Sequence, residues 1–192
     1  MARTASITRN TKETQVSIAV DLDGEGVQVS TGIGFFDHML TAFGFYAKIG
    51  LKVNVHGDLE VDGHHTVEDT GIVLGQALKE ALGDRTGIRR FGSCYVPMDE
   101  ALAFTALDFS NRPYLVFDAG MPQERIGDYD SCLTVEFMRA LAVNAGITLH
   151  QKCFYGANAH HMTEGLFKSL GMAIRDAVRV DGDGVTSTKG VL

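Results

Sequence analysis

A chain of 192 residues, of which 45% are hydrophobic and 21% charged, is long enough to bury one core or two fused units of about 90 residues each. No apolar run approaches the ~20 residues that a membrane helix needs, and the first residues lack the apolar segment of a signal peptide. The formal net charge of −7 argues against a broad nucleic-acid surface, which requires a concentrated basic face. Three cysteines without CxxC spacing indicate neither a disulfide framework nor a thiolate metal site, so we expect a cytoplasmic protein.

The first half of the chain predicts three strands, a helix, a fourth strand and a second helix. Polar and apolar residues alternate in the strand segments, whereas Phe36, Leu40 and Phe43 recur at the spacing of a helix face. A glycine-rich, basic connection at residues 83–92 is typical of a loop. The predicted strands are residues 6–9, 15–22, 27–30 and 51–61, and the predicted helices are residues 34–48 and 62–82.

The second half repeats this order of elements. Its predicted strands are residues 93–97, 101–109, 114–117 and 147–155, and its predicted helices are residues 133–144 and 160–180. Both halves are therefore β-β-β-α-β-α units, the first at residues 1–92 and the second at 93–192. Because each sheet must bury its apolar face, we expect a compact, internally duplicated α+β protein with two four-stranded sheets and helices packed between them. The polar end of the chain, residues 181–192, is typical of a mobile tail.

One short motif, His-His-x-x-Glu, occurs at the start of the last predicted helix in each half. The copies are His64-His65 with Glu68 and His160-His161 with Glu164, and they lie 96 residues apart. A single copy is a weak metal signal, because helix starts commonly carry histidine and glutamate. Two copies at an offset of half the chain favour a metal site whose two clusters meet across a pseudo-twofold axis.

The geometry of a helix indicates how these side chains share metal ions. Residues three and four apart lie on one face, so Glu68 lies one turn beyond both of its histidines. Adjacent histidines point about 100° apart, which favours two neighbouring ions over one. His38 and Glu136 occupy corresponding places on the preceding helices and complete a set suited to Mn, Fe, Co, Ni or Zn with positions left for substrate. The candidate metal ligands are His38, His64, His65, Glu68, Glu136, His160, His161 and Glu164.

Longer motifs are spread over the whole chain. They are TKET at 11–14, STGIGFFDHML at 30–40, GDLEVDGHHTVEDTGI at 57–72, TGIRRFG at 86–92, NRPYL at 111–115, HHMTEGLFK at 160–168 and STKGVL at 187–192. With these motifs the chain resembles the imidazoleglycerol-phosphate dehydratases of histidine biosynthesis. The resemblance implies a duplicated fold of the ribosomal protein S5 domain 2-like kind, and a cytoplasmic homo-oligomer of 24 subunits with active sites at subunit interfaces.

The resemblance also implies the reaction and the cofactor. A metal-dependent hydro-lyase of this family converts imidazole glycerol phosphate to imidazole acetol phosphate through an imidazolate held by two Mn²⁺ ions. Carried over by position, one ion would be bound by His38, His65, Glu68 and His161, and the other by His64, Glu136, His160 and Glu164. Glu136 departs from the histidine often found at this position, and its carboxylate favours a harder ion such as Mn²⁺.

Further roles follow from the resemblance alone. Glu164 would be the base that takes the substrate's C2 proton, and Glu13 would be contributed to the site of a neighbouring subunit. The tail at the end of the chain would fold over the substrate as a lid. Ala42 and Tyr46 depart from the glutamine and histidine that many relatives have. The residues implied for the substrate phosphate are Arg90, Arg112, Lys168, Ser187 and Lys189.

Two other functions fit the metal ligands. A two-metal hydrolase would use a bridging hydroxide as its nucleophile, although such sites are usually richer in aspartate than this mostly imidazole set. A non-catalytic metal-binding or metal-stabilised assembly protein would also use such ligands, but it would not need a phosphate-binding set. The sequence therefore predicts the dehydratase, with these two alternatives.

Overall fold

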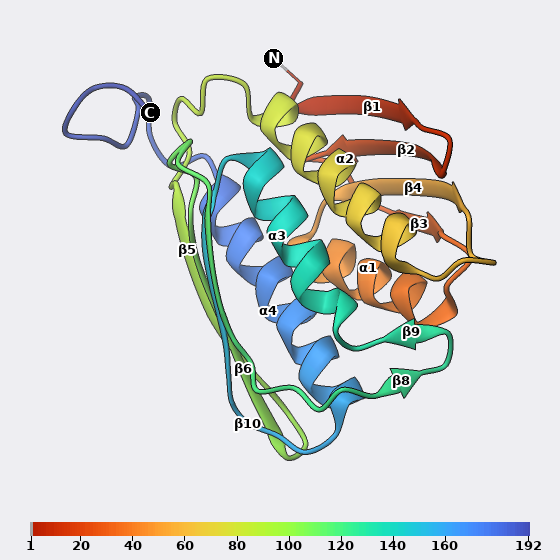
Figure 1. The fold of residues 1–192 in the computed structure, drawn as a ribbon. Coiled ribbons are helices and arrows are strands. Elements are labelled where there is room, and N and C mark those ends of the chain that lie inside the picture. The colour runs from red at the N-terminus through yellow and green to blue at the C-terminus, as the bar shows by residue number, and fades with distance from the viewer. Residues whose placement is uncertain (1) are drawn as a thin grey trace.

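The computed structural model describes residues 2–192 and consists of two four-stranded sheets with four helices between them (Figure 1). The helices are α1 Gly34–Ala47, α2 His64–Leu82, α3 Leu133–Ala145 and α4 Ala159–Val178. The strands are β1 Thr4–Asn10, β2 Thr14–Asp21, β3 Val27–Ser30, β4 Gly50–Gly57, β5 Phe91–Met98, β6 Ala101–Asp108, β7 Tyr114–Asp118, β8 Arg125–Ile126, β9 Tyr129–Asp130 and β10 Thr148–Tyr155.

The two sheets have the same topology. Their strand orders are β1-β2-β4-β3 and β5-β6-β10-β7. In each sheet the last strand in this order, β3 or β7, pairs in parallel with its neighbour, and the other pairs are antiparallel. The predicted α+β duplication is therefore confirmed. β5 begins at Phe91, slightly ahead of the boundary predicted between the two units.

Alternating burial along the strands turns one face of each sheet toward the helices. On β2 the buried residues are Thr14, Val16, Ile18 and Val20, and on β6 they are Ala101, Ala103, Thr105 and Leu107. This is the period of two that a half-buried strand requires. A single large apolar cluster takes side chains from both sheets and all four helices, so the two repeats share one core.

Each helix makes its main helix contact with a helix of the other repeat: α1 packs against α4, and α2 packs against α3. Glycines at equivalent places permit both close crossings. A Cβ atom added at Gly75 would lie 2.8 Å from the carbonyl oxygen of Leu141, and one added at Gly171 would lie 2.6 Å from that of Phe43. Both distances are shorter than van der Waals contact, so a side chain at either position would push the helices apart.

Two features differ from the predicted elements. A short hairpin, β8–β9, lies between β7 and α3, and its Tyr129 is completely buried with its hydroxyl 3.0 Å from that of Thr134. The strand predicted at residues 51–61 ends at Gly57, and the turn that follows carries Asp58. Among residues 2–192 the helices include none with the length and apolarity to span a membrane.

Candidate active site

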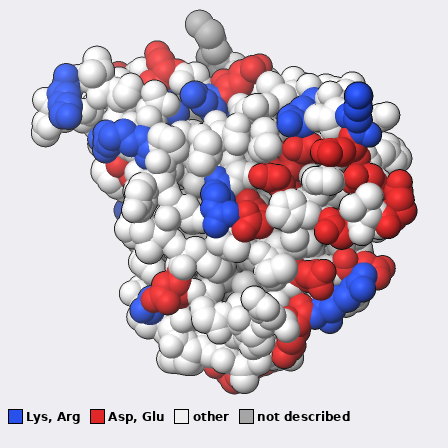
Figure 2. Space-filling view, in the orientation of Figure 1, with Lys and Arg blue, Asp and Glu red and all other residues white. Residues whose placement is uncertain are grey.

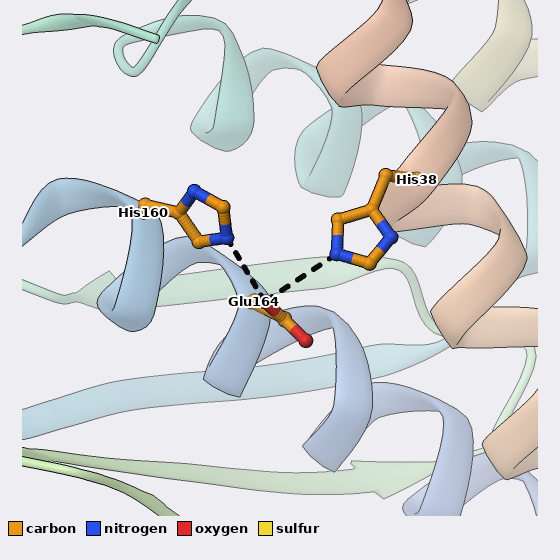
Figure 3. Close-up of side chains that lie close together, drawn as sticks. All are labelled: His38, His160 and Glu164. Atoms are coloured by element: carbon orange, nitrogen blue, oxygen red, sulfur yellow. Dashed lines mark hydrogen bonds and ion pairs between the residues drawn. The ribbon is translucent and has the colours of Figure 1, made fainter.

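Three predicted ligands meet where α1 packs against α4. The ligand atoms of His38, His160 and Glu164 all lie within 4.8 Å of one another. Glu164 Oε2 is 3.1 Å from His160 Nε2 and 3.5 Å from His38 Nε2 (Figure 3). Two imidazoles and a carboxylate are ligand types that a divalent transition metal accepts, so the residues present fit an ion.

The start of α4 is fixed by its cap. Asn158 Oδ1 accepts hydrogen bonds from the backbone nitrogens of His160, at 2.9 Å, and His161, at 3.4 Å. This side chain satisfies amide groups that the first turn of a helix leaves without partners. Phe35 packs edge-on against the ring of His160, with ring centroids 4.9 Å apart. Cap and ring contact together hold His160 toward α1.

Glu164 is buried beside a cation of its own helix. Lys168 Nζ lies 2.7 Å from Glu164 Oε1 and 5.5 Å from the centre of the Tyr46 ring. Burial acts to raise the pKa of Glu164, but the hydrogen bond and charge of Lys168, with the charge of His38, outweigh it. The net pKa lies below the ordinary value, so Glu164 is a carboxylate at neutral pH. The structure thus places Lys168, predicted for the phosphate, directly at the metal-ligand group.

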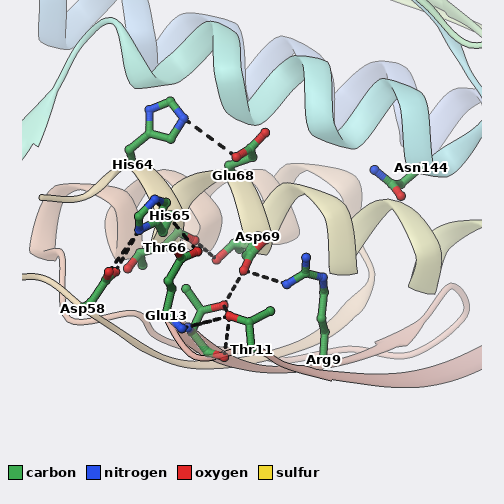
Figure 4. Close-up of polar contacts among 12 residues, drawn as sticks. Arg9, Thr11, Glu13, Asp58, His64, His65, Thr66, Glu68, Asp69 and Asn144 are labelled. Atoms are coloured by element: carbon green, nitrogen blue, oxygen red, sulfur yellow. Dashed lines mark hydrogen bonds and ion pairs between the residues drawn. The ribbon is translucent and has the colours of Figure 1, made fainter. Parts of the chain in front are cut away.

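The first histidine pair lies at the start of α2 (Figure 4). His64 Nε2 is 3.7 Å from Glu68 Oε2, and both side chains are more than 40% exposed. His65 Nδ1 is 3.0 Å from Asp58 Oδ2, while its Nε2 lies 3.9 Å from Glu13 Oε2. The hydrogen bond to Asp58 raises the pKa of His65. Glu13, predicted for the site of a neighbouring subunit, therefore lies beside a histidine of its own chain.

His161, the second histidine of the other pair, also contacts acidic groups. Its Nδ1 lies 2.7 Å from Glu100 Oε2, and its Nε2 lies 3.6 Å from Asp99 Oδ2. Hydrogen bonds from His161 and from the backbone nitrogens of Asn158 and Ala157 lower the pKa of Glu100 to about 2. Glu100 raises the pKa of His161 in turn. Neither Asp58 nor Glu100 was among the predicted site residues.

Within one chain the ligands do not form the two predicted sets. Over residues 2–192, the cluster of metal-ligand atoms contains His38, His160 and Glu164 and no other predicted ligand. His38 was assigned to one ion and the other two residues to the second. The reason for this grouping is the packing of α1 against α4. Glu136 lies on α3, which packs against α2, and forms an ion pair with Arg139.

The arginines predicted for the phosphate meet at Asp108. Arg90 donates from Nε to Asp108 Oδ1 at 2.6 Å and from Nη2 to Oδ2 at 2.9 Å, and Arg112 Nη2 lies 3.7 Å from the same Oδ2. Asp108 was not predicted for the site. Its position at the end of β6, between the two arginines in sequence, was the available signal.

The tail is held against this arginine. Arg90 Nη1 donates to the carbonyl oxygen of Thr186 at 2.7 Å, and the Thr186 hydroxyl donates to the carbonyl oxygen of Ile88 at 2.9 Å. Ser187 and Lys189 follow directly, and the hydroxyl of Ser187 accepts from the Lys189 backbone nitrogen at 3.2 Å. The tail predicted to be mobile thus has specific hydrogen bonds to the loop that carries Arg90.

The charge distribution agrees with cation binding. In Figure 2 acidic side chains gather on the half of the visible face that carries the start of α2 and the β8–β9 hairpin. Basic side chains are scattered over this view and form no broad patch. A concentration of acidic groups attracts cations and disfavours a nucleic-acid backbone.

Comparisons with known proteins agree over nearly the whole chain. A family model for imidazoleglycerol-phosphate dehydratase matches residues 31–174. The chain is 54% identical to the enzyme of that name from Acetivibrio thermocellus over 195 aligned residues, which cover 100% of both chains. It is 53% identical to the one from Lacticaseibacillus casei, over 99% of this chain and 100% of the relative.

Two solved structures are also similar. Imidazoleglycerol-phosphate dehydratase from Staphylococcus aureus has a TM-score of 0.85 and 38% identity, and the match covers 93% of this chain and 99% of that one. The enzyme from Pyrococcus furiosus, solved in complex with (S)-C348, has a TM-score of 0.85 and 40% identity, with 97% and 100% coverage.

Proposed function

The chain belongs to the imidazoleglycerol-phosphate dehydratase family, and we propose that it carries out the removal of water from imidazole glycerol phosphate in histidine biosynthesis at a site that holds two Mn²⁺ ions. One structural observation carries the metal part of this proposal. His38, His160 and Glu164 gather imidazole and carboxylate atoms within 4.8 Å in a chain that matches the family over its full length. Family membership favours the dehydratase over a two-metal hydrolase or a non-catalytic metal-binding assembly protein.

The active site would be shared between subunits. One chain gathers only part of the predicted ligand set, and His64 and Glu68 remain partly exposed on another part of the surface. A second copy that presents this surface to the His38 group would complete the eight ligands. Exposed aromatic side chains on the second sheet, including Tyr95 and Phe154, support an oligomer because such surface is usually covered in assemblies. We propose the 24-subunit assembly of the family.

The cellular setting is also part of the proposal. The three cysteines, Cys94, Cys132 and Cys153, are free thiols. Free thiols are expected in a reducing compartment, where disulfides do not persist. We therefore propose a cytoplasmic enzyme.

The reaction requires loss of the substrate's C2 proton and of its C3 hydroxyl, which leave together as water. When bound, the divalent ions would act as Lewis acids that polarise the substrate's imidazole ring and help it accept electron density. Glu164 would accept the C2 proton at a carboxylate oxygen. Its contact with Lys168 opposes the effect of burial and keeps this carboxyl group deprotonated and in place. Glu13 would act in the site of a neighbouring subunit.

Cations from two parts of the chain would bind the phosphate of the substrate. Lys168 lies at the Glu164 group, and Arg90 and Arg112 lie around Asp108. Two nitrogens of Arg90, Nε and Nη2, donate to Asp108, and the third, Nη1, donates to the carbonyl oxygen of Thr186 in the tail. Phosphate binding at Arg90 would therefore be linked to the position of Ser187 and Lys189. Deletion of residues 186–192 should raise the Michaelis constant, and an unchanged constant and turnover number would exclude a lid.

A direct assay tests the function. The purified full-length protein should convert imidazole glycerol phosphate to imidazole acetol phosphate with Mn²⁺, and a chelator should abolish turnover. Elemental analysis should find two metal ions per subunit. Product formation with metal-free protein would contradict the metal-dependent mechanism, and metal binding without turnover would favour the assembly protein.

A further inference from the structure

The second histidine of each pair has its Nδ1 atom beside a carboxylate that lies outside the predicted ligand set. The distances are 3.0 Å from His65 Nδ1 to Asp58 Oδ2 and 2.7 Å from His161 Nδ1 to Glu100 Oε2. The first histidine of each pair differs, because its Nε2 atom faces the glutamate one turn later. The arrangement is therefore repeated in the two halves and is specific to the second histidine.

The two carboxylates come from different elements. Asp58 directly follows β4, in the connection to α2, whereas Glu100 lies in the turn between β5 and β6. If both carboxylates had been inherited through the duplication, they would lie at equivalent positions in the two repeats. Their positions are not equivalent. The same contact has been built twice from different parts of the fold, which points to a requirement at the histidine itself.

A carboxylate at Nδ1 determines which ring nitrogen can bind a metal ion. An ionised carboxylate only accepts hydrogen bonds, so the Nδ1 atom must carry the proton. In a neutral ring the lone pair then lies on Nε2, the nitrogen that is available as a ligand. The Nε2 atoms of His65 and His161 lie 3.9 Å from Glu13 and 3.6 Å from Asp99, beyond hydrogen-bonding distance. Both Nε2 atoms therefore remain free to bind an ion.

Glu100 is itself held in place by the backbone. Its Oε1 atom accepts hydrogen bonds from the nitrogens of Ala157, at 3.1 Å, and Asn158, at 2.8 Å. Its Oε2 atom faces His161. One oxygen thus fixes the side chain to the connection before α4, and the other fixes the ring. Asp58 is held through its backbone nitrogen, which donates to the carbonyl oxygen of Glu13 at 3.0 Å.

We propose that Asp58 and Glu100 are positioning residues that keep His65 and His161 in the Nδ1-protonated form, with Nε2 presented to a metal ion. This inference rests on the two-metal site proposed above. Loss of a carboxylate that orients a metal-binding histidine commonly weakens metal affinity by roughly 10- to 100-fold.

Substitution of Glu100 by glutamine gives the sharpest test. The two backbone donors would retain the amide oxygen, so the amide nitrogen would face His161 and donate to Nδ1. The proton would then move to Nε2 and block it as a ligand. Glu100→Ala removes the acceptor but leaves the ring free to adopt either form. We therefore expect Glu100→Gln to weaken binding more than Glu100→Ala, the reverse of what simple loss of packing predicts.

The measurement is Mn²⁺ binding to the full-length, metal-depleted protein. Electron paramagnetic resonance of the free ion monitors this binding. We expect about 10- to 100-fold weaker binding for Glu100→Gln and for Asp58→Ala, which removes the acceptor at His65, with assembly size unchanged. Asp58→Ala acts at the other helix, so it tests the inference independently of any folding defect at Glu100. Asp118→Asn, which removes an exposed carboxylate paired with Lys152, is the matched control and should bind Mn²⁺ as the wild type does.

The outcomes separate this inference from the proposed function. If the wild type binds Mn²⁺ and dehydrates the substrate while Glu100→Gln and Asp58→Ala bind Mn²⁺ equally well, the positioning role is wrong and the function stands. If glutamine is no worse than alanine at position 100, the proton-placement argument is wrong. A wild-type protein that binds no Mn²⁺ would overturn both proposals.

Discussion

The two histidine pairs have the same motif but different surroundings. In the second pair, Glu164 is buried and lies next to His38, His160 and Lys168. In the first pair, Glu68 is half-buried and lies 3.7 Å from His64. The second cluster is thus organised within one chain, and the first is open. The two repeats therefore share the histidines and glutamate of the motif, but the residues around the motif differ between them.

Two sequence differences account for this contrast. Position 72, the equivalent of Lys168, is Ile72, so Glu68 has no cation one turn beyond it. Glu136, the equivalent of His38, carries a negative charge like Glu68, and it turns to Arg139 instead. Two carboxylates repel each other unless a cation lies between them. The open cluster therefore depends more strongly on a bound ion for its order.

Replacing the glutamate of each cluster should give the largest difference in turnover between matched variants. Glu164→Gln should lower the turnover number by about 10²- to 10⁴-fold even at saturating Mn²⁺, because the proton acceptor is lost. Glu68→Gln, the matched variant, should mainly weaken Mn²⁺ binding and recover turnover as Mn²⁺ is raised. Steady-state assays across a Mn²⁺ series distinguish the two. Recovery of Glu164→Gln at high Mn²⁺ would remove its role as the base.

Each helix crossing joins the two repeats, and substitutions at their glycines test whether the two crossings are equally tight. Gly75→Ala and Gly171→Ala should each lower the free energy of unfolding by about 1–3 kcal/mol, because the added methyl group meets backbone atoms of the facing helix. Gly182→Ala, where no atom lies within 4 Å of the added Cβ, is the control. Thermal unfolding measures all three. A marked difference between Gly75 and Gly171 would show that the crossings have diverged.

Lys168→Met should make the second cluster resemble the first. Without Lys168, less opposes the effect of burial and the pKa of Glu164 rises, so protons compete with the metal ion at higher pH. The pH at which Mn²⁺ binding is half lost on acidification should therefore rise. Titration of Mn²⁺ binding from about pH 8 to about pH 4 measures this midpoint. An unchanged midpoint would mean that Lys168 does not control the Glu164 charge.

Glu136→His should make the first cluster more like the second, with the smallest effect. A histidine replaces a hard carboxylate ligand by a softer imidazole, so preference should move from Mn²⁺ toward Zn²⁺ by about tenfold or less. Competition binding with the two ions measures this shift. Arg139, the present partner of Glu136, should lose its ion pair without a measurable change in stability, since exposed pairs contribute little.

The fold was largely predictable because periodicity and duplication are local or repeated signals. The order of the strands and helices followed from alternation and from the two copies of the histidine motif. The β8–β9 hairpin was missed because strands as short as Arg125–Ile126 and Tyr129–Asp130 have no measurable period. The burial of Tyr129 depends on packing against Phe36, which is distant in sequence.

The site was predictable in its residues more than in their grouping. Alignment of the repeats found His38 and Glu136 as counterparts, but it could not determine which helices pack together. Helix pairing depends on the close crossings at Gly75 and Gly171, which are tertiary contacts. Asp58, Glu100 and Asp108 were missed because acidic residues at turns and strand ends are usually solvated. The assigned roles of the ligands and phosphate-binding residues stay predictions.

The exchange of helix contacts between the repeats has a consequence for the origin of the molecule. Each repeat covers its helices with those of the other, so a half-length precursor would have exposed both helices of its core. Such a precursor would have been stable only as a symmetric dimer with two identical copies of every contact. Once the two copies were joined in one chain, their sequences no longer had to be identical. Ile72 and Lys168, or Glu136 and His38, could then change separately, and the surroundings of the two histidine pairs could come to differ.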